Sequence, residues 1–174
     1  MRNLLDTADA KYIKELTNFI GFRLYKKESD TDMNELDKLV KLWAAVVDIT
    51  RSDPSKVEAL EEFGTWFASG KFDAKWSLEQ LTYSASRAKQ IHLDFAALER
   101  METLAKDHPK ESLAALSAMV DGAKERWAID SWSSHAKVVI QSANDSSDTS
   151  IKESVKKLVD KLVAKGYLEY RDII

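Results

Sequence analysis

The sequence predicts an all-α protein, and three observations carry that prediction. Apolar residues recur at three- and four-residue spacings along most of the chain, which is the period of an amphipathic helix. The 174 residues include only five Gly and two Pro, which suits long helices joined by short turns. Capping residues, Pro and Gly stand where the helical period is interrupted. We therefore expect about eight amphipathic helices in a single domain, residues 1–174.

The first half holds four of these helices. The first is expected to end near Lys27, and the second follows a polar break and ends near Ile49. The third starts at an N-cap followed by Pro in the first turn, Asp53-Pro54, and ends at Gly70, which tolerates the left-handed conformation. Asp73 is the expected N-cap of the fourth helix.

The corner between the third and fourth helices is unusually aromatic, and its rings are Phe63, Trp66, Phe67, Phe72 and Trp76. We interpret them as a plug between helices, because large aromatic residues at helical spacing usually fill space. The alternative is a partner-binding patch, since Trp is a common interface anchor.

Gly64 lies within the third predicted helix. A glycine there costs roughly 1 kcal/mol relative to Ala. We therefore expect another backbone to approach closely at Gly64, helped by the small Ala85 and Ala88.

The second half is predicted to hold four more helices. One is capped by Asp94, and the next begins at Pro109 and continues to Trp127. A third restarts at Asp130-Ser131, and the last is capped within residues 147–149 and ends at Gly166. The polar segment Ser142–Ser150 is the best candidate for disorder or proteolysis, whereas the apolar tail 167–174 is expected to dock on the domain.

Short links between helices favour antiparallel neighbours. We expect stacked antiparallel hairpins of the HEAT-like kind, and the alternative is a closed helical bundle. A weak internal match supports stacking: the segment from Pro54 to Trp66 resembles the segment from Pro109 to Trp127, about 55 residues later.

Bulk composition excludes several classes of protein. The chain has no Cys, which excludes disulfides and thiolate metal sites and suits a cytoplasmic location. The N-terminus has no apolar signal core, and no apolar run is long enough for a membrane span. The net charge is −3 and is evenly spread, so no basic face typical of a nucleic-acid binder is evident.

Side chains with catalytic or metal-binding potential do not form a recognisable motif. His92, His108 and His135 lie in separate elements, without the spacing of a zinc site. The serines beside His135 are Ser131, Ser133 and Ser134, with Asp130 before them. They are consecutive and lack the strand–turn–helix setting of a nucleophile.

Two further polar features also have ordinary interpretations. Adjacent carboxylates on a helix point in different directions, so we interpret Glu61-Glu62 as part of a solvated helix face. The scattered glycines exclude a phosphate-binding loop. We thus predict no catalytic, cofactor-binding or metal residue, no cofactor, and a protein that is not an enzyme.

The last predicted helix is locally basic. Lys157, Lys161 and Lys165 are four residues apart on one face, with Lys152 and Lys156 beside them. Such a face suits phosphate contacts, but lysines near a helix C-terminus also complement the helix dipole.

Three segments, FGTWFASGKFDAKWSLEQL, HPKESLAALSAMVDGAKERW and KLVDKLVAKGYLEYRDII, carry a family resemblance. Together they resemble the C-terminal helical region of very large bacterial multidomain proteins. The resemblance covers about residues 57–174. Many such proteins carry an upstream P-loop NTPase or another effector domain and are thought to act in defence against phage. The resemblance implies that this chain is the C-terminal part of a longer protein and that any ATPase activity lies outside it.

These observations favour a non-catalytic helical interaction module, a scaffold or sensor. Its partner would be another protein or the rest of the parent chain, and self-association is possible; a membrane partner is not expected. The alternative is a nucleic-acid-contacting module that uses the basic last helix. A third hypothesis is a small-molecule sensor whose cavity lies beside Trp66 and Trp76.

Overall fold

The computed structural model describes residue 5 and residues 7–26, 32–123 and 126–173, and it confirms the all-α class. No strand occurs within these residues. The helices are α2 (Ala10–Lys26), α3 (Met33–Ser52), α4 (Phe63–Ala68), α5 (Ala74–Arg87), α6 (Asp94–Leu104), α7 (Pro109–Gly122), α8 (Arg126–Asn144) and α9 (Thr149–Ala164), with the 3-10 helices η1 (Pro54–Glu62) and η2 (Leu168–Ile173). In the described part of the chain, no helix is both long enough and apolar enough to cross a membrane.

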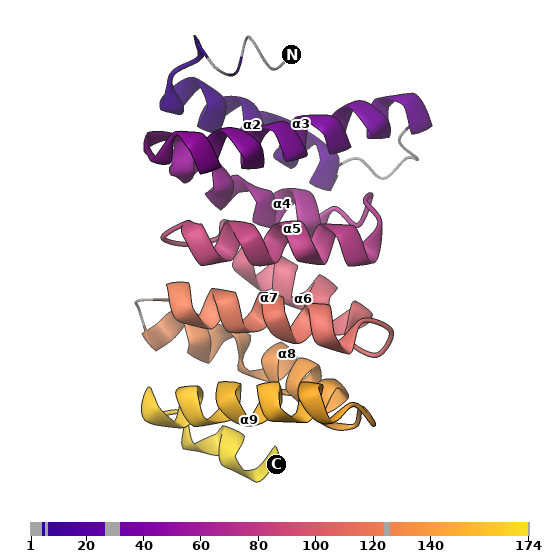
Figure 1. Ribbon diagram of the computed structural model, residues 1–174, viewed down its shortest axis with the longest axis vertical. Helices are drawn as coiled ribbons and strands as arrows, with labels where there is room; N and C mark the ends of the chain where they lie inside the picture. The colour runs from indigo at the N-terminus through magenta and orange to yellow at the C-terminus, as the bar shows by residue number, and fades with distance from the viewer. Residues whose placement is uncertain (1–4, 6, 27–31, 124–125, 174) are drawn as a thin grey trace.

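The helices form two layers along the long axis of the molecule (Figure 1). One layer consists of α3, α5, α7 and α9, and the other consists of α2, η1 with α4, α6 and α8. The helices of the first layer begin 41, 35 and 40 residues apart, within the usual range of helical repeats. The predicted 55-residue match does not reflect this period, because Pro54 and Pro109 begin helices of different layers. Membership of the HEAT-like class stays a prediction.

The aromatic corner is core, as the plug interpretation predicts. Phe63 and Trp66 are fully buried, and Trp43 of α3 joins them with its ring stacked 4.6 Å from Phe63. The indole Nε1 of Trp66 donates a hydrogen bond of 2.8 Å to the Thr17 carbonyl. The corner therefore joins α2, α3 and α4 in one cluster, and Trp76 closes it as a half-buried ring against Trp43.

A backbone does approach Gly64 closely. A Cβ placed there would overlap the carbonyl oxygen of His92 and the side chain of Ile91. The expected neighbours were wrong, because the carbonyls of Ala85 and Ala88 lie beside Gly122 instead. The connection between α5 and α6 thus crosses directly over α4.

Four predictions about helix boundaries are wrong. The third helix divides into η1 and α4 rather than forming one helix. The sixth ends at Gly122, and α8 runs through Asp130 and Ser131 without a restart. The cap of α6 is Leu93 in the left-handed conformation (φ 54°), because the carboxylate of Asp94 instead accepts hydrogen bonds from Phe95 N and the Trp132 indole.

The C-terminal part follows the prediction more closely. Asp148 caps α9 through Ser150 N, and Gly166 ends the helix region at a φ of 98°. The segment predicted to be disordered lies mostly in α8 and α9, with a link of four residues between them. The tail docks on the domain: Tyr170 is fully buried, and Asn144 Nδ2 donates to the Ile173 carbonyl at 3.1 Å.

Candidate functional site

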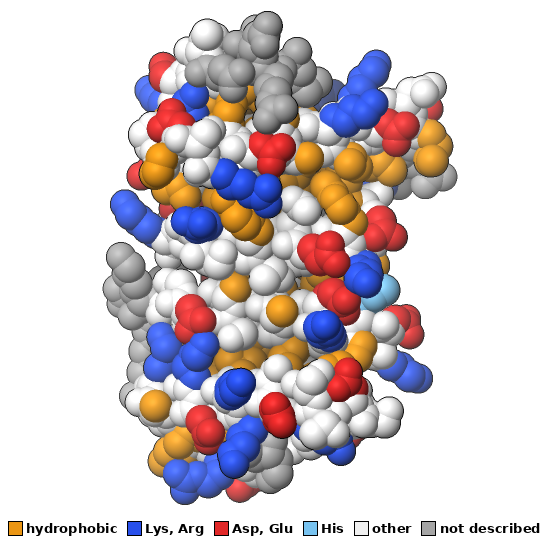
Figure 2. Space-filling model, in the orientation of Figure 1, with side chains coloured by type: hydrophobic (Ala, Val, Ile, Leu, Met, Phe, Trp, Pro, Cys, Tyr) orange, Lys and Arg blue, Asp and Glu red, His pale blue; other side chains and the backbone are white. Residues whose placement is uncertain are grey.

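A groove of about 550 Å³ lies between α7 and α9, and Ser86 of α5 also lines it. We call it the α7–α9 groove. Its floor is apolar and includes the buried Leu113, Ile151 and Leu158. Figure 2 shows hydrophobic side chains between lysines on this face of the molecule. The remaining lining residues are Lys110, Ala114, Ser117, Ala118, Asp121, Ser150, Ser154, Lys157 and Lys161.

The groove exists because the facing stripes of the two helices carry small side chains. Ala114 and Ala118 on α7 are four residues apart, as are Ser150 and Ser154 on α9, so each pair lies on one helix face. These side chains are too short to fill the space above the floor. The sequence contains this signal, but which two helices face each other was not predictable from it.

One end of the groove is held by an ion pair. Lys161 Nζ lies 2.7 Å from Asp121 Oδ1 and 3.3 Å from Ser117 Oγ. This contact joins α9 to α7 and neutralises one lysine of the rim. The rim nevertheless keeps a positive balance, because Lys110 and Lys157 also line it.

The electrostatic effect of Lys110 reaches the cap of α9. The pKa of Asp148 lies below its usual value, chiefly because Ser150 donates hydrogen bonds to its carboxylate and in smaller part because Lys110 is near. An anionic group brought to this end of the groove would meet the same lysine.

The basic face predicted on the last helix is only partly available. Lys161 is paired with Asp121, and Lys165 Nζ donates to the Ala123 carbonyl at 3.4 Å. Lys157 lines the groove, whereas Lys152 and Lys156 are exposed outside it. The three lysines four residues apart therefore do not act as one free cationic stripe.

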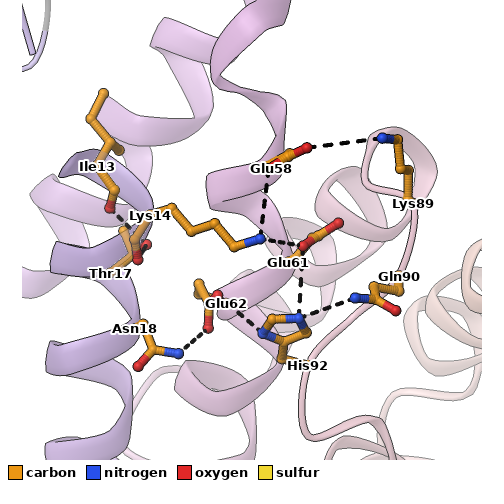
Figure 3. A network of polar contacts seen from close by, with 10 residues as sticks. All are labelled: Ile13, Lys14, Thr17, Asn18, Glu58, Glu61, Glu62, Lys89, Gln90 and His92. Carbon is orange, nitrogen blue, oxygen red and sulfur yellow. Dashed lines mark hydrogen bonds and ion pairs between the residues drawn. The ribbon is translucent and has the colours of Figure 1, made fainter. Parts of the chain in front are cut away.

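A second polar cluster, the buried charge network, joins α2, η1 and the connection from α5 to α6 (Figure 3). Lys14 Nζ lies 2.8 Å from Glu61 Oε2. Glu62 accepts a hydrogen bond of 2.7 Å from Asn18, and its other oxygen lies 3.0 Å from His92 Nδ1. Glu58, Lys89 and Gln90 form its outer part.

The network overturns the interpretation of Glu61-Glu62 as a solvated face. Both residues are buried, and both carboxylates converge on His92, at 3.7 Å from Glu61 and 3.0 Å from Glu62. These residues lie at the end of a 3-10 helix, packed between α2 and the α5–α6 connection. Their three partners, Lys14, Asn18 and His92, come together only through tertiary packing.

The network shifts the proton affinities of its members. The hydrogen bond that the His92 ring donates to the Glu62 carboxylate is the main reason that the pKa of His92 is raised. Burial alone would raise the pKa of Glu62, but hydrogen bonds from His92 and Asn18 outweigh it and lower that pKa. The pKa of Lys14 is raised, chiefly by its hydrogen bond to Glu61. Each shift favours the charged forms, which is the behaviour of a structural ion-pair network.

The other residues considered for catalysis do not assemble. His135 Nδ1 contacts Glu102 of α6 rather than a serine, while Ser131 and Ser134 are exposed on α8. His108 lies at the N-cap of α7, in a different element from His92 and His135. Among the described residues, no three His, Cys, Asp or Glu side chains are placed to hold a metal ion.

Neither Trp66 nor Trp76 lines the α7–α9 groove, so that groove is not the cavity expected beside them. Trp66 is fully buried and packs on the rings of Trp43, Phe63 and Phe72 at centroid distances of 5.7, 5.2 and 5.9 Å. Such packing fills the space that a small-molecule sensor would need. The third hypothesis loses its main support.

Comparison of the chain with family models, curated proteins and solved structures gave no match.

Proposed function

We propose that this chain is a non-catalytic helical interaction module, a scaffold or sensor of a larger bacterial protein, and that the α7–α9 groove binds an acidic amphipathic helix of a protein partner. The single observation that carries the proposal is a groove with an apolar floor and a rim of three lysines against one aspartate. Helix-in-groove recognition uses such a floor for apolar anchors. The lysines would pair with acidic residues beside those anchors.

The dimensions of the groove suit this occupant. Its wall on α7 extends from Lys110 to Asp121, which corresponds to about 16 Å, or three turns, at 1.5 Å per residue. Three turns present apolar side chains at positions i, i+4 and i+7 to the floor. The charge of the rim would favour a partner helix that carries Glu or Asp on both flanks of that stripe.

Nucleic acid is the second candidate, and the groove favours it less. A nucleic-acid site needs several free cations, often with aromatic rings for base stacking. Here Lys161 is paired with Asp121, and none of the described residues that line the groove is aromatic. The apolar floor would gain nothing from a phosphate backbone.

The test uses fluorescein-labelled helical peptides of three to four turns, with Leu at i, i+4 and i+7 and Glu on the flanks. Binding to the full chain is followed by anisotropy, beside scrambled peptides of the same composition and a labelled single-stranded DNA. We expect binding of the patterned peptide, and Lys157→Glu should weaken it at least about 10-fold, because a rim cation becomes an anion facing acidic residues. NMR shift changes should map to α7 and α9.

Lys156→Glu is the matched control, because Lys156 is the exposed neighbour of Lys157 and does not line the groove. It should leave peptide affinity unchanged. Equal losses in both variants, or equal binding of scrambled peptides, would contradict the groove as the site. Salt-sensitive binding of the DNA, lost to a similar extent in both variants, would favour the nucleic-acid alternative.

A further inference from the structure

The outward side of α2 carries four large aromatic side chains in solvent. Tyr12, Phe19, Phe22 and Tyr25 are 49%, 59%, 52% and 43% exposed. The opposite side of the same helix is buried on η1 and α4 through Ile13, Thr17, Gly21 and Leu24. We call the exposed set the α2 aromatic face. A helix that is apolar on both sides is typical of one packed between two neighbours.

The aromatic face continues into a second groove. A hollow of about 720 Å³ lies between the C-terminal half of α2 and the start of α3. Ile20, Leu24 and Leu39 line it beside the two phenylalanines. The face is thus a ridge of rings next to an apolar hollow, a shape that can receive a similar ridge.

Charges of both signs border this surface. The Arg23 guanidinium lies 5.6 Å from the ring centroid of Phe19, and Lys26 Nζ lies 4.2 Å from that of Phe22. Glu35 of α3 lines the other wall of the hollow. Under a two-fold rotation, the ring ridge of one copy would meet the apolar hollow of the other.

We propose that the α2 aromatic face is a homodimer interface, on which a second copy of this chain packs its own α2 about a two-fold axis. The rings of one α2 would enter the hollow of the partner, with the Arg23 and Lys26 side chains at the border of the interface. The proposal is independent of the α7–α9 groove, which lies at the other end of the molecule (Figure 1).

The exposed area agrees with this occupant. Four rings that each expose about half of roughly 200 Å² present on the order of 400 Å² of apolar surface. A stable interface buries about 800 Å² per partner, of which the homodimer average is about 65% apolar. The aromatic face supplies most of the apolar share that such a dimer needs, and polar residues around it would supply the rest.

The first experiment is sedimentation equilibrium of the full chain from 1 to 500 µM. We expect the mass to approach twice the 19.7 kDa of one chain as concentration rises. The double variant Phe19→Glu/Phe22→Glu should remain at the monomer mass, with the dimer Kd raised at least about 100-fold, because interface aromatics are typical hot spots. Leu168→Glu, at the similarly exposed Leu168 of η2, is the matched control and should dimerise normally.

Folding of each variant is checked by far-UV circular dichroism, and the three exposed positions, 19, 22 and 168, should tolerate Glu. Cross-linking then tests the geometry. Because the chain has no cysteine, Glu15→Cys introduces a single thiol on the outer side of α2. Oxidation should convert this variant, but not Leu168→Cys, to a disulfide-linked dimer.

Three results would overturn the proposal. The first is a wild-type chain that stays monomeric at 500 µM, and the second is a Phe19→Glu/Phe22→Glu variant that still dimerises. The third is a monomer that binds anionic phospholipid vesicles through the two phenylalanines, since exposed rings beside Arg and Lys also suit a membrane surface. None of these results bears on peptide binding to the α7–α9 groove.

Discussion

His92 is the residue on which the buried charge network depends. It contacts both buried carboxylates through its ring, and its backbone N donates to the Glu61 carbonyl at 2.8 Å. Leu93, next in the chain, takes the left-handed conformation, which is costly for a branched side chain. The network therefore holds the α5–α6 connection in a conformation that its own sequence does not favour.

The network predicts how the stability of the protein depends on pH. The raised pKa of His92 means that its contribution is complete below about pH 6.5 and is lost as pH rises through the higher pKa of the folded state. The lowered pKa of Glu62 means that its contribution is present above about pH 4.5 and is lost as pH falls through the folded-state pKa. Between these limits the two residues stabilise the fold most.

We expect the wild-type chain to lose roughly 0.5–1 kcal/mol of unfolding free energy between pH 6 and pH 8.5 through His92, a value reduced for partial solvent exposure. His92→Gln should be less stable at pH 6 and should lose less stability over this interval. Urea unfolding at several pH values measures the difference. His108→Gln is the matched control, and an equal flattening there would show that the network is not the cause.

Gly64 is the second residue on which the fold depends. Gly64→Ala should destabilise the protein by about 2–3 kcal/mol, because the new methyl group would overlap the His92 carbonyl and the Ile91 side chain. Thermal unfolding measures this loss. Gly122→Ala is the contrasting variant: its nearest neighbour would be at an ordinary 3.5 Å, so the gain in helix propensity should leave stability equal or higher. Similar losses in both would contradict the close approach at Gly64.

At the scale of the element, the helix boundaries depend on local side-chain chemistry. Asp73 accepts a hydrogen bond of 2.8 Å from Trp76 N and begins α5, as the sequence predicts. The same logic fails at α6, where the carboxylate of Asp94 binds the Trp132 indole of α8. A cap motif is reliable only where no distant donor competes for its oxygen atoms.

Asp73→Ala should therefore cost about 1 kcal/mol of unfolding free energy, because the first turn of α5 would lose its capping acceptor. Asp73→Asn should retain most of the stability, since Asn caps about as well as Asp. Glu79→Ala, at an exposed position within α5, is expected to have little effect. Urea unfolding of the three variants measures these differences in unfolding free energy. If Asp73→Asn lost as much stability as Asp73→Ala, the charge of Asp73, and not its capping hydrogen bond, would be the cause.

At the scale of the whole molecule, the two helical layers enclose the aromatic corner and leave two candidate binding surfaces on the outside. The aromatic corner lies within the first half of the stack, where Trp43 joins the two layers. The α2 aromatic face and the α7–α9 groove lie outside it, at opposite ends. A chain with two unlike surfaces can bind a second copy at one end and a different partner at the other, which is the arrangement we propose for this scaffold.

The sequence alone determined the helical class and most element boundaries, because these depend on local spacing and on caps. Asp53-Pro54, Asp73, Gly70 and Gly166 each act within one turn of their own position. The helix ends that these residues set can therefore be predicted without knowledge of residues distant in the sequence. For the aromatic corner the sequence favoured a core, because large rings at helical spacing usually fill space, but it left a partner-binding patch open as the alternative.

The tertiary structure decided everything that depends on partners distant in sequence. Glu61 and Glu62 resemble a solvated pair until Lys14, Asn18 and His92 are packed around them. Phe19 and Phe22 resemble core residues until α2 is found at the end of its layer. Hydrophobic periodicity identifies which face of a helix is apolar, but only the packing of helices determines whether that face meets protein or water.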